Sequence, residues 1–363
     1  MNNFYLKNFF KQEILDSPTY IVNGVKGMIK LDAMENPFTL DENTSKELGL
    51  FIAKSNLNRY PTNELYNQTI KSIREYTNLE DNLELMLGNG SDEIISILSC
   101  VLEDNSYILS PVPSFIMYKV SASLSRLNFI GVNLDNYFDI DIKAMKKSID
   151  EYNPKLIYLA YPNNPTGKCF SEQSIVEIIN YAKNSLIIID EAYQPFTLGK
   201  TFLNKLSQII ENNPNVLVMR TLSKLGLAGL RLGYIAGHKE FINQINKARP
   251  PYNINSLTQK AVQFLLPRSN IFEQQAHIIC AERKYLKLKL EKFGHVYESD
   301  ANFLLVKMNK DANIIESILK SQGILVKNAS NMHSSLDNCL RISVGTFAEN
   351  NALIYALQEI NKY

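Results

Sequence analysis

Three short polar segments, 161–167, 190–193 and 221–224, each follow a run of β-branched and apolar residues. They supply an amide, a carboxylate, a phenol and an amine: Asn164, Asp190, Tyr193 and Lys224. Apolar runs bounded by polar turns are typical of buried strands in a parallel sheet. The carboxyl ends of such strands line a ligand crevice. We therefore expect these four side chains to meet at one site.

Lys224 is the central candidate for covalent chemistry. A lysine can attack an aldehyde, and later move protons, only if a lowered pKa supplies a neutral amine. On its own it would be interpreted as a surface lysine. However, Thr221 and Ser223 offer hydroxyls beside it, and Arg231 offers a charged fork for a phosphate dianion. This set is suited to holding a phosphorylated pyridine aldehyde as a Schiff base.

Asp190 and its neighbours match the remaining parts of such a ligand. A carboxylate at Asp190 would keep a pyridine nitrogen protonated and make the ring an electron sink, although helix capping is a common alternative. Tyr193 and Asn164 can donate to a phenolic oxygen on the ring. The alternative for residues 164–167 is a tight turn without a ligand, and the two roles are compatible.

Further candidates are weaker when taken singly. Residues 88–93 open a helix at Ser91 and Asp92, and helix N-termini bind anions. Phe115 could stack on a ring, although core packing is the simpler interpretation. Tyr60 could contribute from a second subunit. Arg341 lies in a strand-like segment, where a carboxylate or phosphate suits its bidentate geometry.

Composition bounds the class of protein. The chain has 363 residues and a formal net charge of +1, which gives no basic footprint for nucleic acid or an anionic membrane. No apolar run approaches the ~18 residues that span a bilayer. The scattered cysteines favour a reduced, cytoplasmic compartment. The histidines show no ligand spacing, so we predict no metal.

The order of elements predicts an α/β fold. Strand-like and helix-like segments alternate up to residues 235–236, which indicates a mostly parallel sheet covered by helices on both faces. A long helical stretch at 256–293 then leads to strands at 303–306 and 340–344. We expect an N-terminal arm (1–35), a large domain (36–248) and a smaller α+β C-terminal domain (249–363).

These motifs together resemble the fold-type I pyridoxal-phosphate aminotransferases of the aspartate aminotransferase superfamily. The resemblance covers nearly the whole chain. Within the superfamily the chain is most similar to the histidinol-phosphate aminotransferase family, on segments 35–37, 59–61, 90–93, 250–253, 301–303 and 339–342. In such a protein the large domain binds the cofactor, pyridoxal 5'-phosphate.

The resemblance implies a role for each candidate. Lys224 would carry the Schiff base and act as acid and base, and Arg341 would take the substrate's anionic group. The other cofactor residues would be Ser91, Asp92, Phe115, Asn164, Asp190, Tyr193, Thr221, Ser223 and Arg231, with Tyr60 reaching the other subunit's cofactor. Asn36, Tyr20 and Lys327 would lie near the substrate.

Two positions depart from the family pattern. Met34 stands where many members have asparagine, and Lys327 stands where they usually have arginine. A lysine is a point charge and lacks the bidentate fork of arginine. This difference bears directly on which substrates the protein accepts.

The family's reaction transfers an amino group between L-histidinol phosphate and 2-oxoglutarate, giving imidazole acetol phosphate and L-glutamate, in L-histidine biosynthesis. The resemblance also implies a cytoplasmic homodimer with active sites at the interface. Two alternatives keep every cofactor residue: an aromatic amino-acid transaminase and a phosphothreonine decarboxylase. A cofactor-sensing regulator would need a DNA-binding unit, for which we expect no room before the first motif.

Overall fold

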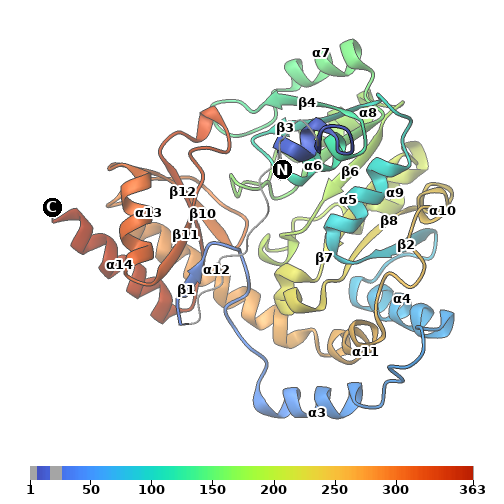
Figure 1. Ribbon diagram of the computed structural model, residues 1–363, viewed down its shortest axis with the longest axis horizontal. Coiled ribbons are helices and arrows are strands. Elements are labelled where there is room, and N and C mark those ends of the chain that lie inside the picture. The colour runs from blue at the N-terminus through green and yellow to red at the C-terminus, as the bar shows by residue number, and fades with distance from the viewer. Residues whose placement is uncertain (1–5, 17–26, 363) are drawn as a thin grey trace.

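The chain forms two sheets, each packed against its own helices (Figure 1). The computed structural model describes residues 6–16 and 27–362. The larger sheet has seven strands. In spatial order they are β2 (Leu83–Gly88), β8 (Gly233–His238), β7 (Val216–Thr221), β6 (Leu186–Asp190), β5 (Leu156–Ala160), β3 (Tyr107–Val112) and β4 (Asn128–Asn133).

Most neighbouring strands in this sheet run parallel, and only β8 is antiparallel to its neighbours. The three central strands β5, β6 and β7 pair in close register, with Ala160 opposite Asp190 and Asp190 opposite Met219. Their carboxyl ends therefore lie side by side at one edge. The prediction of an α/β fold with a mostly parallel sheet is confirmed.

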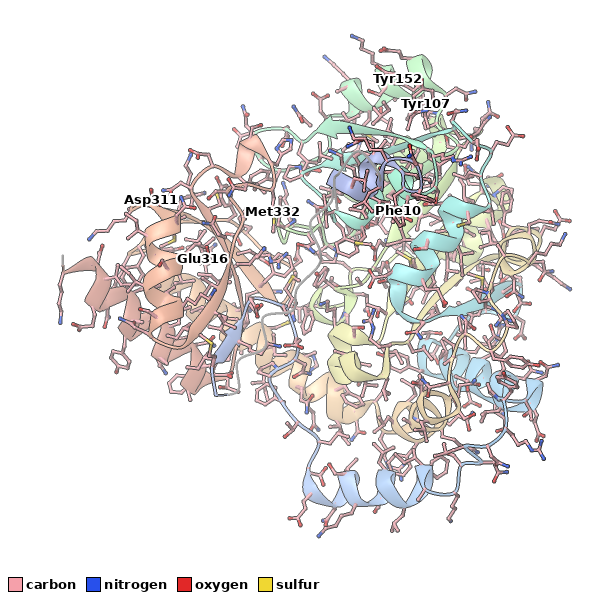
Figure 2. The ribbon with its side chains drawn as sticks, viewed as in Figure 1. Phe10, Tyr107, Tyr152, Asp311, Glu316 and Met332 are labelled. Carbon is pink, nitrogen blue, oxygen red and sulfur yellow. The ribbon has the colours of Figure 1, made fainter. Side chains whose placement is uncertain are left out.

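The strands alternate their side chains between two helical layers, as a pleated backbone requires. Ile157 and Leu159 enter one core, whereas Leu156 and Tyr158 enter the other. The first layer comprises α4 (Asn63–Thr77), α7 (Ile142–Tyr152), α8 (Glu172–Tyr181), α9 (Leu206–Asn212) and α11 (Ser256–Leu265). The second comprises α5 (Gly90–Cys100), α6 (Met117–Leu124) and α10 (Lys239–Asn246). At the rim of the first layer, Tyr107 packs on Tyr152 with ring centroids 5.3 Å apart (Figure 2).

Several helices begin at a polar residue that caps their first turn. Asp41 caps α3 (Glu42–Ile52), Thr62 caps α4, and Asp141 caps α7, each by accepting a backbone N–H bond. In contrast, Asn89 at the start of α5 makes no side-chain cap bond within the described chain. The first N–H groups of α5 therefore remain available to another acceptor.

The smaller sheet has five strands, in the order β1 (Ile29–Leu31), β11 (Ile324–Asn328), β12 (Cys339–Ser343), β10 (Phe303–Met308) and β9 (Gly294–Val296). Only β1 and β11 pair in parallel. The helices packed on this sheet are α12 (Asn270–Leu290), α13 (Ala312–Ser321) and α14 (Phe347–Asn361). A short helix, α2 (Gln12–Asp16), precedes the sheet in sequence.

The helical stretch expected at 256–293 is present, and a short 3-10 turn at 266–268 divides it into two α-helices. Pro267 explains the break, because proline lacks an N–H and clashes with the preceding turn. Of the two resulting helices, α11 packs in the larger core, and α12 runs from Phe272 in that core to Leu286 in the smaller one. We propose that the two bodies divide within α12, later than the expected boundary at 248, and that β1 belongs with the smaller body rather than with an arm.

No helix within residues 6–16 and 27–362 is both long and apolar enough to cross a bilayer.

A buried ion pair joins the ends of two central strands. Arg220 of β7 lies 2.8 Å from Glu191, which directly follows β6, and the two side chains are 10% and 0% exposed. Thr201 donates to Glu191 and accepts from Arg220, and the N–H of Phe202 also donates to Glu191. This network fixes the segments that precede Tyr193 and Lys224.

We expect Glu191→Ala to lower the free energy of unfolding by about 3–5 kcal/mol, because it leaves the Arg220 charge buried without its carboxylate partner. Urea denaturation at constant pH measures the change. The matched control is Glu172→Ala, which breaks an exposed pair with Lys205 and should cost less than about 1 kcal/mol. Equal losses in the two variants would contradict the role given to the buried pair.

Candidate active site

A cavity of about 110 Å³ lies where the carboxyl ends of β5, β6 and β7 meet. It is lined by Met34, Ser91, Asp92, Phe115, Tyr118, Ala160, Pro162, Asn164, Asp190, Ala192, Tyr193, Thr221, Ser223, Lys224 and Arg231. Every expected cofactor residue except Tyr60 is therefore gathered at one place.

Lys224 follows β7 in the short helix η3 (Ser223–Leu227). Its Nζ donates to the carbonyl of Ala33 at 3.1 Å and lies 5.7 Å from the centre of the Tyr193 ring. Burial, reinforced by the charge of Arg341, lowers the pKa of Lys224 to about 8. The neutral amine that a nucleophile requires is therefore present as a minor fraction at pH 7 and as half of the amine near pH 8.

Asp190 ends β6 and is 5% exposed. Its Oδ2 accepts from the hydroxyl of Tyr118 at 2.6 Å, and its Oδ1 accepts from the N–H of Ala192 at 3.0 Å. Burial raises the pKa of Asp190 to about 6, and both hydrogen bonds oppose that rise. At pH 7 the carboxylate is therefore largely ionised despite its burial.

A chain of hydrogen bonds crosses the cavity from the smaller sheet. Arg341 Nη1 donates to Asn164 Oδ1 at 2.7 Å, and Asn164 Nδ2 donates to the hydroxyl of Tyr193 at 3.2 Å. The Tyr193 hydroxyl donates in turn to the sulfur of Met34 at 3.2 Å. Burial raises the pKa of Tyr193, so the phenol keeps its proton and remains a donor.

The start of α5 forms an anion cradle with the segment after β7. Arg231 donates to Ser223 Oγ at 3.4 Å and pairs with Asp92 at 3.0 Å, and Thr221 donates to Ser223 Oγ at 2.9 Å. Gly90 has a φ of +77°, and a Cβ there would lie 2.6 Å from Arg231 Nη2. The backbone N–H groups, two hydroxyls and a guanidinium suit a phosphate dianion.

The remaining expected residues lie outside the cavity lining. Tyr60 is 76% exposed and stacks on Tyr252 with ring centroids 4.5 Å apart. Asn36 donates to the carbonyl of Leu225 at 3.0 Å and to Gln275 at 2.9 Å, so its amide braces the loop that carries Lys224. Tyr20 lies outside the described residues.

Arg341 and Lys327 project from the same face of the smaller sheet. Lys327 is exposed and lies directly opposite Arg341 in the register of β11 and β12. Directly opposed residues of an antiparallel pair project from the same face. Arg341 is buried and donates to Asn164 at the edge of the cavity, and Lys327 projects beside it.

Sequence reasoning missed two features of the site. Tyr118 was not singled out, although it lies only three residues after Phe115 and its ring contacts the Phe115 ring edge-on. The backbone of residues 32–34 was also missed: the carbonyls of Asp32 and Ala33 accept from Arg341 and Lys224. The position of a backbone carbonyl cannot be predicted from the type of its residue.

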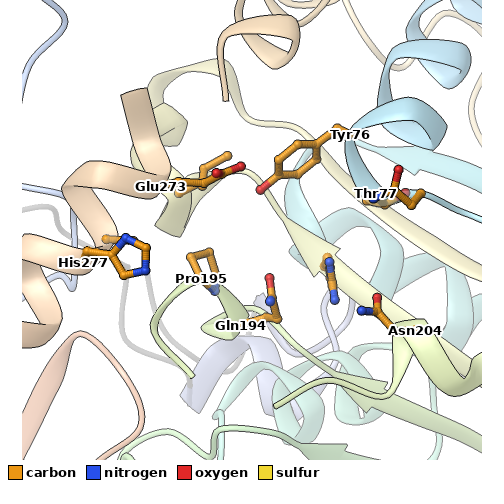
Figure 3. Close-up of a pocket in the computed structure, with 11 residues that line it drawn as sticks. Tyr76, Thr77, Gln194, Pro195, Asn204, Glu273 and His277 are labelled. Atoms are coloured by element: carbon orange, nitrogen blue, oxygen red, sulfur yellow. The ribbon is translucent and has the colours of Figure 1, made fainter. Parts of the chain in front are cut away.

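A second hollow of about 270 Å³ lies near the end of α4 and the start of α12 (Figure 3). Tyr76, Gln194, Arg220, Glu273 and His277 are among its lining residues. Arg220 is already paired with Glu191, and the acidic and histidine side chains on the rim are exposed. No expected site residue lines this hollow.

Among the described residues, no three histidine, cysteine, aspartate or glutamate side chains gather as metal ligands would.

Comparison with known proteins decides the family. The family model "Aminotransferase class I and II" matches residues 26–357. This chain belongs to that family. The aminotransferase is 41% identical to "Histidinol-phosphate aminotransferase 1" of Burkholderia lata, over 97% of this chain and 98% of the relative.

Solved structures agree on the fold. The histidinol-phosphate aminotransferase from Clostridium acetobutylicum matches with a TM-score of 0.83 and 26% identity, covering 92% of this chain and 99% of that one. The one from Sinorhizobium meliloti, in complex with pyridoxal-5'-phosphate, matches with a TM-score of 0.82 and 20% identity, covering 98% of each chain.

Aminotransferases of this class use pyridoxal 5'-phosphate, and the cavity of this aminotransferase suits that group. The ionised Asp190 can face the ring nitrogen, and Asn164 with Tyr193 can donate to the phenolic oxygen. The cradle of Gly90 and Arg231 suits the phosphate, since a side chain at Gly90 would fill it. Lys224 supplies the amine.

We expect capture of pyridoxal 5'-phosphate by the aminotransferase stripped of cofactor to accelerate as pH rises and to reach half its plateau near pH 8. The lowered pKa of Lys224 makes the amine neutral above that pH. Stopped-flow absorbance measures the rate. Nα-acetyl-lysine, the control, should accelerate only through its ordinary pKa of about 10.4. Matching profiles would contradict the lowered pKa.

Proposed function

We propose that this aminotransferase transfers an amino group between L-histidinol phosphate and 2-oxoglutarate, giving imidazole acetol phosphate and L-glutamate, in L-histidine biosynthesis. The curated relatives that are about 40% identical over nearly the whole chain carry the name of this activity. The structural observation that supports the proposal is the direct opposition of two cations, Arg341 and Lys327, in the register of β12 and β11.

Two like charges placed directly opposite on a sheet repel each other. The repulsion is relieved when an anion lies between them, and both expected substrates bring one, as a phosphate or as a carboxylate. Arg341 is held by Asn164 and by the carbonyl of Asp32, so it presents a fixed fork. Lys327 is exposed and adds a mobile point charge. One fixed and one mobile cation suit anions of different length.

When bound, pyridoxal 5'-phosphate supplies an electron sink for the pair of electrons left by a broken Cα–H bond. Lys224 Nζ is the group that moves the proton, because a pKa of about 8 allows the amine to accept it and the ammonium to return it. The carbonyl of Ala33 holds Nζ in place at 3.1 Å. Burial excludes competing water from this exchange.

The other residues of the cavity would hold and orient the cofactor and the substrate. Asp190 presents an ionised carboxylate whose two oxygens are fixed by Tyr118 and Ala192. Asn164 links the cavity to Arg341, so the donor at the ring and the anion fork form one hydrogen-bonded unit. Such preorganised polar groups need little rearrangement as charge develops.

We also propose that two copies pair as a cytoplasmic homodimer, with Tyr60 of each reaching the active site of the other. The stacked Tyr60 and Tyr252 support this, because both rings are largely exposed on the described chain, at 76% and 55%. Exposed aromatic clusters are typical of protein interfaces.

The decisive experiment adds L-histidinol phosphate, L-phenylalanine or O-phospho-L-threonine separately to the yellow holoenzyme and follows the visible absorbance of the cofactor. We expect half-maximal loss of absorbance at a concentration at least ~10-fold lower for L-histidinol phosphate than for L-phenylalanine, since a charged hydrogen bond to phosphate is worth a factor of that size.

A better response to L-phenylalanine would make the protein an aromatic amino-acid transaminase. Release of carbon dioxide from O-phospho-L-threonine would make it a decarboxylase. The control is Lys224→Ala, which should retain the cofactor non-covalently and lose turnover at least ~100-fold, because it removes the acid–base group.

We expect Lys327→Arg to lower the KM for L-histidinol phosphate about 3- to 10-fold and to leave kcat nearly unchanged, because arginine adds a bidentate bond to the anion. Steady-state kinetics with both substrates measure the effect. Lys320→Arg, on the exposed face of α13, is the control. An unchanged KM would show that Lys327 does not contact the anion.

A further inference from the structure

We propose that Tyr118 is a positioning residue that acts through Asp190 to keep the pyridine nitrogen of the cofactor protonated. The inference rests on the proposed function only in that the protein binds pyridoxal 5'-phosphate; it does not depend on which amine is the substrate. Tyr118 lines the cavity but makes its hydrogen bond to Asp190.

The hydrogen bond between these residues is short and buried. The Tyr118 hydroxyl lies 2.6 Å from Asp190 Oδ2, and neither residue is more than 5% exposed. Burial raises the pKa of Tyr118 well above its ordinary value, so the phenol stays a donor across the working pH range. A charge-assisted bond of this length is among the strong ones in proteins.

An aromatic clamp fixes the direction of that hydroxyl. The Tyr118 ring stacks on Tyr158 with centroids 4.2 Å apart and an interplanar angle of 2°. Phe115 meets the same ring edge-on, 5.7 Å away at 88°. The clamp leaves the phenol little rotational freedom, so the carboxylate it holds is fixed as well.

Burial and hydrogen bonding have opposite effects on the pKa of Asp190, and the Tyr118 hydroxyl supplies one of the hydrogen bonds. Burial favours the neutral acid, whereas the bonds from Tyr118 and Ala192 favour the carboxylate. Only the carboxylate stabilises a protonated pyridine nitrogen. If the Tyr118 bond is lost, burial dominates, and the shared proton moves from the ring nitrogen to the carboxyl group.

A purely structural role would look different. A core tyrosine can donate its hydroxyl to any nearby acceptor simply because an unpaired buried hydroxyl is costly. Removing that hydroxyl would then alter stability without altering the ring nitrogen. The two roles separate in a measurement made on the cofactor itself.

The test compares Tyr118→Phe with Tyr158→Phe in the holoenzyme. Both variants keep the stacked rings and lose one buried hydroxyl, but only Tyr118 is hydrogen-bonded to Asp190. The primary readout is the ¹⁵N chemical shift of ¹⁵N-labelled pyridoxal 5'-phosphate as a function of pH, with no substrate present. Steady-state kinetics with an amino donor give kcat and KM.

In Tyr118→Phe we expect the ring nitrogen to lose its proton at a pH about 1–2 units lower, the shift that loss of one hydrogen bond to a charged group produces. The kcat should fall about 10- to 100-fold, and the KM of the donor should change less than about 3-fold, because the anion fork is untouched. Tyr158→Phe should titrate like the unmodified protein.

A double-mutant cycle tests the route through Asp190. In an Asp190→Asn background the carboxylate is gone, so adding Tyr118→Phe should cause no further change in the ¹⁵N titration. A further shift of the same size, or a titration of Tyr118→Phe identical to that of Tyr158→Phe, would overturn the inference.

If Tyr118→Phe fails to retain the cofactor, the same point is measured without it. The ¹³C signal of the Asp190 carboxyl group in the protein stripped of cofactor should then report a pKa above the original value of about 6. An unchanged carboxyl titration would overturn the inference, whatever the outcome of the substrate experiments.

Discussion

Parallel pairing of β5, β6 and β7 is the constraint on which the site depends. Parallel strands place all their carboxyl ends at one edge, and the register that puts Ala160 opposite Asp190 also aligns the segments that follow. Asn164, Asp190 and Lys224 come from distant parts of the sequence, yet Asp190 ends its strand and the other two follow theirs by only a few residues. The sheet therefore supplies the geometry, and the loops supply the chemistry.

Burial then sets the reactivity of what the sheet brings together. Removal from water lowers the pKa of Lys224 and raises that of Asp190, so both groups titrate within a few units of neutrality. Perturbed groups of this kind cluster at functional sites. The buried pair of Arg220 and Glu191 lies beneath the same loops and holds them without itself reaching the cavity lining.

The sequence allowed the sheet and the gathering of the cavity residues to be predicted, because both depend on local signals. Apolar runs predicted the strands, and polar residues directly after them predicted the side chains of the cavity. Long-range pairings were inaccessible to the same reasoning. The amide of Asn36, a residue expected near the substrate, bonds to Leu225 and Gln275, which lie 189 and 239 residues away. Tyr118 was overlooked because its partner, Asp190, lies 72 residues away.

The two sheets together complete the site, so no single segment of the sequence identifies the substrate. Arg341 reaches from β12 to Asn164 in the larger body, and the segment after β1 provides the carbonyl that holds Lys224. Met34 in that segment has a φ of +54°, a conformation that asparagine tolerates better than methionine. The strained residue persists where its sulfur meets Tyr193. A departure from the family pattern therefore coincides with a contact that lines the cavity, where the segment after β1 meets a loop of the larger sheet.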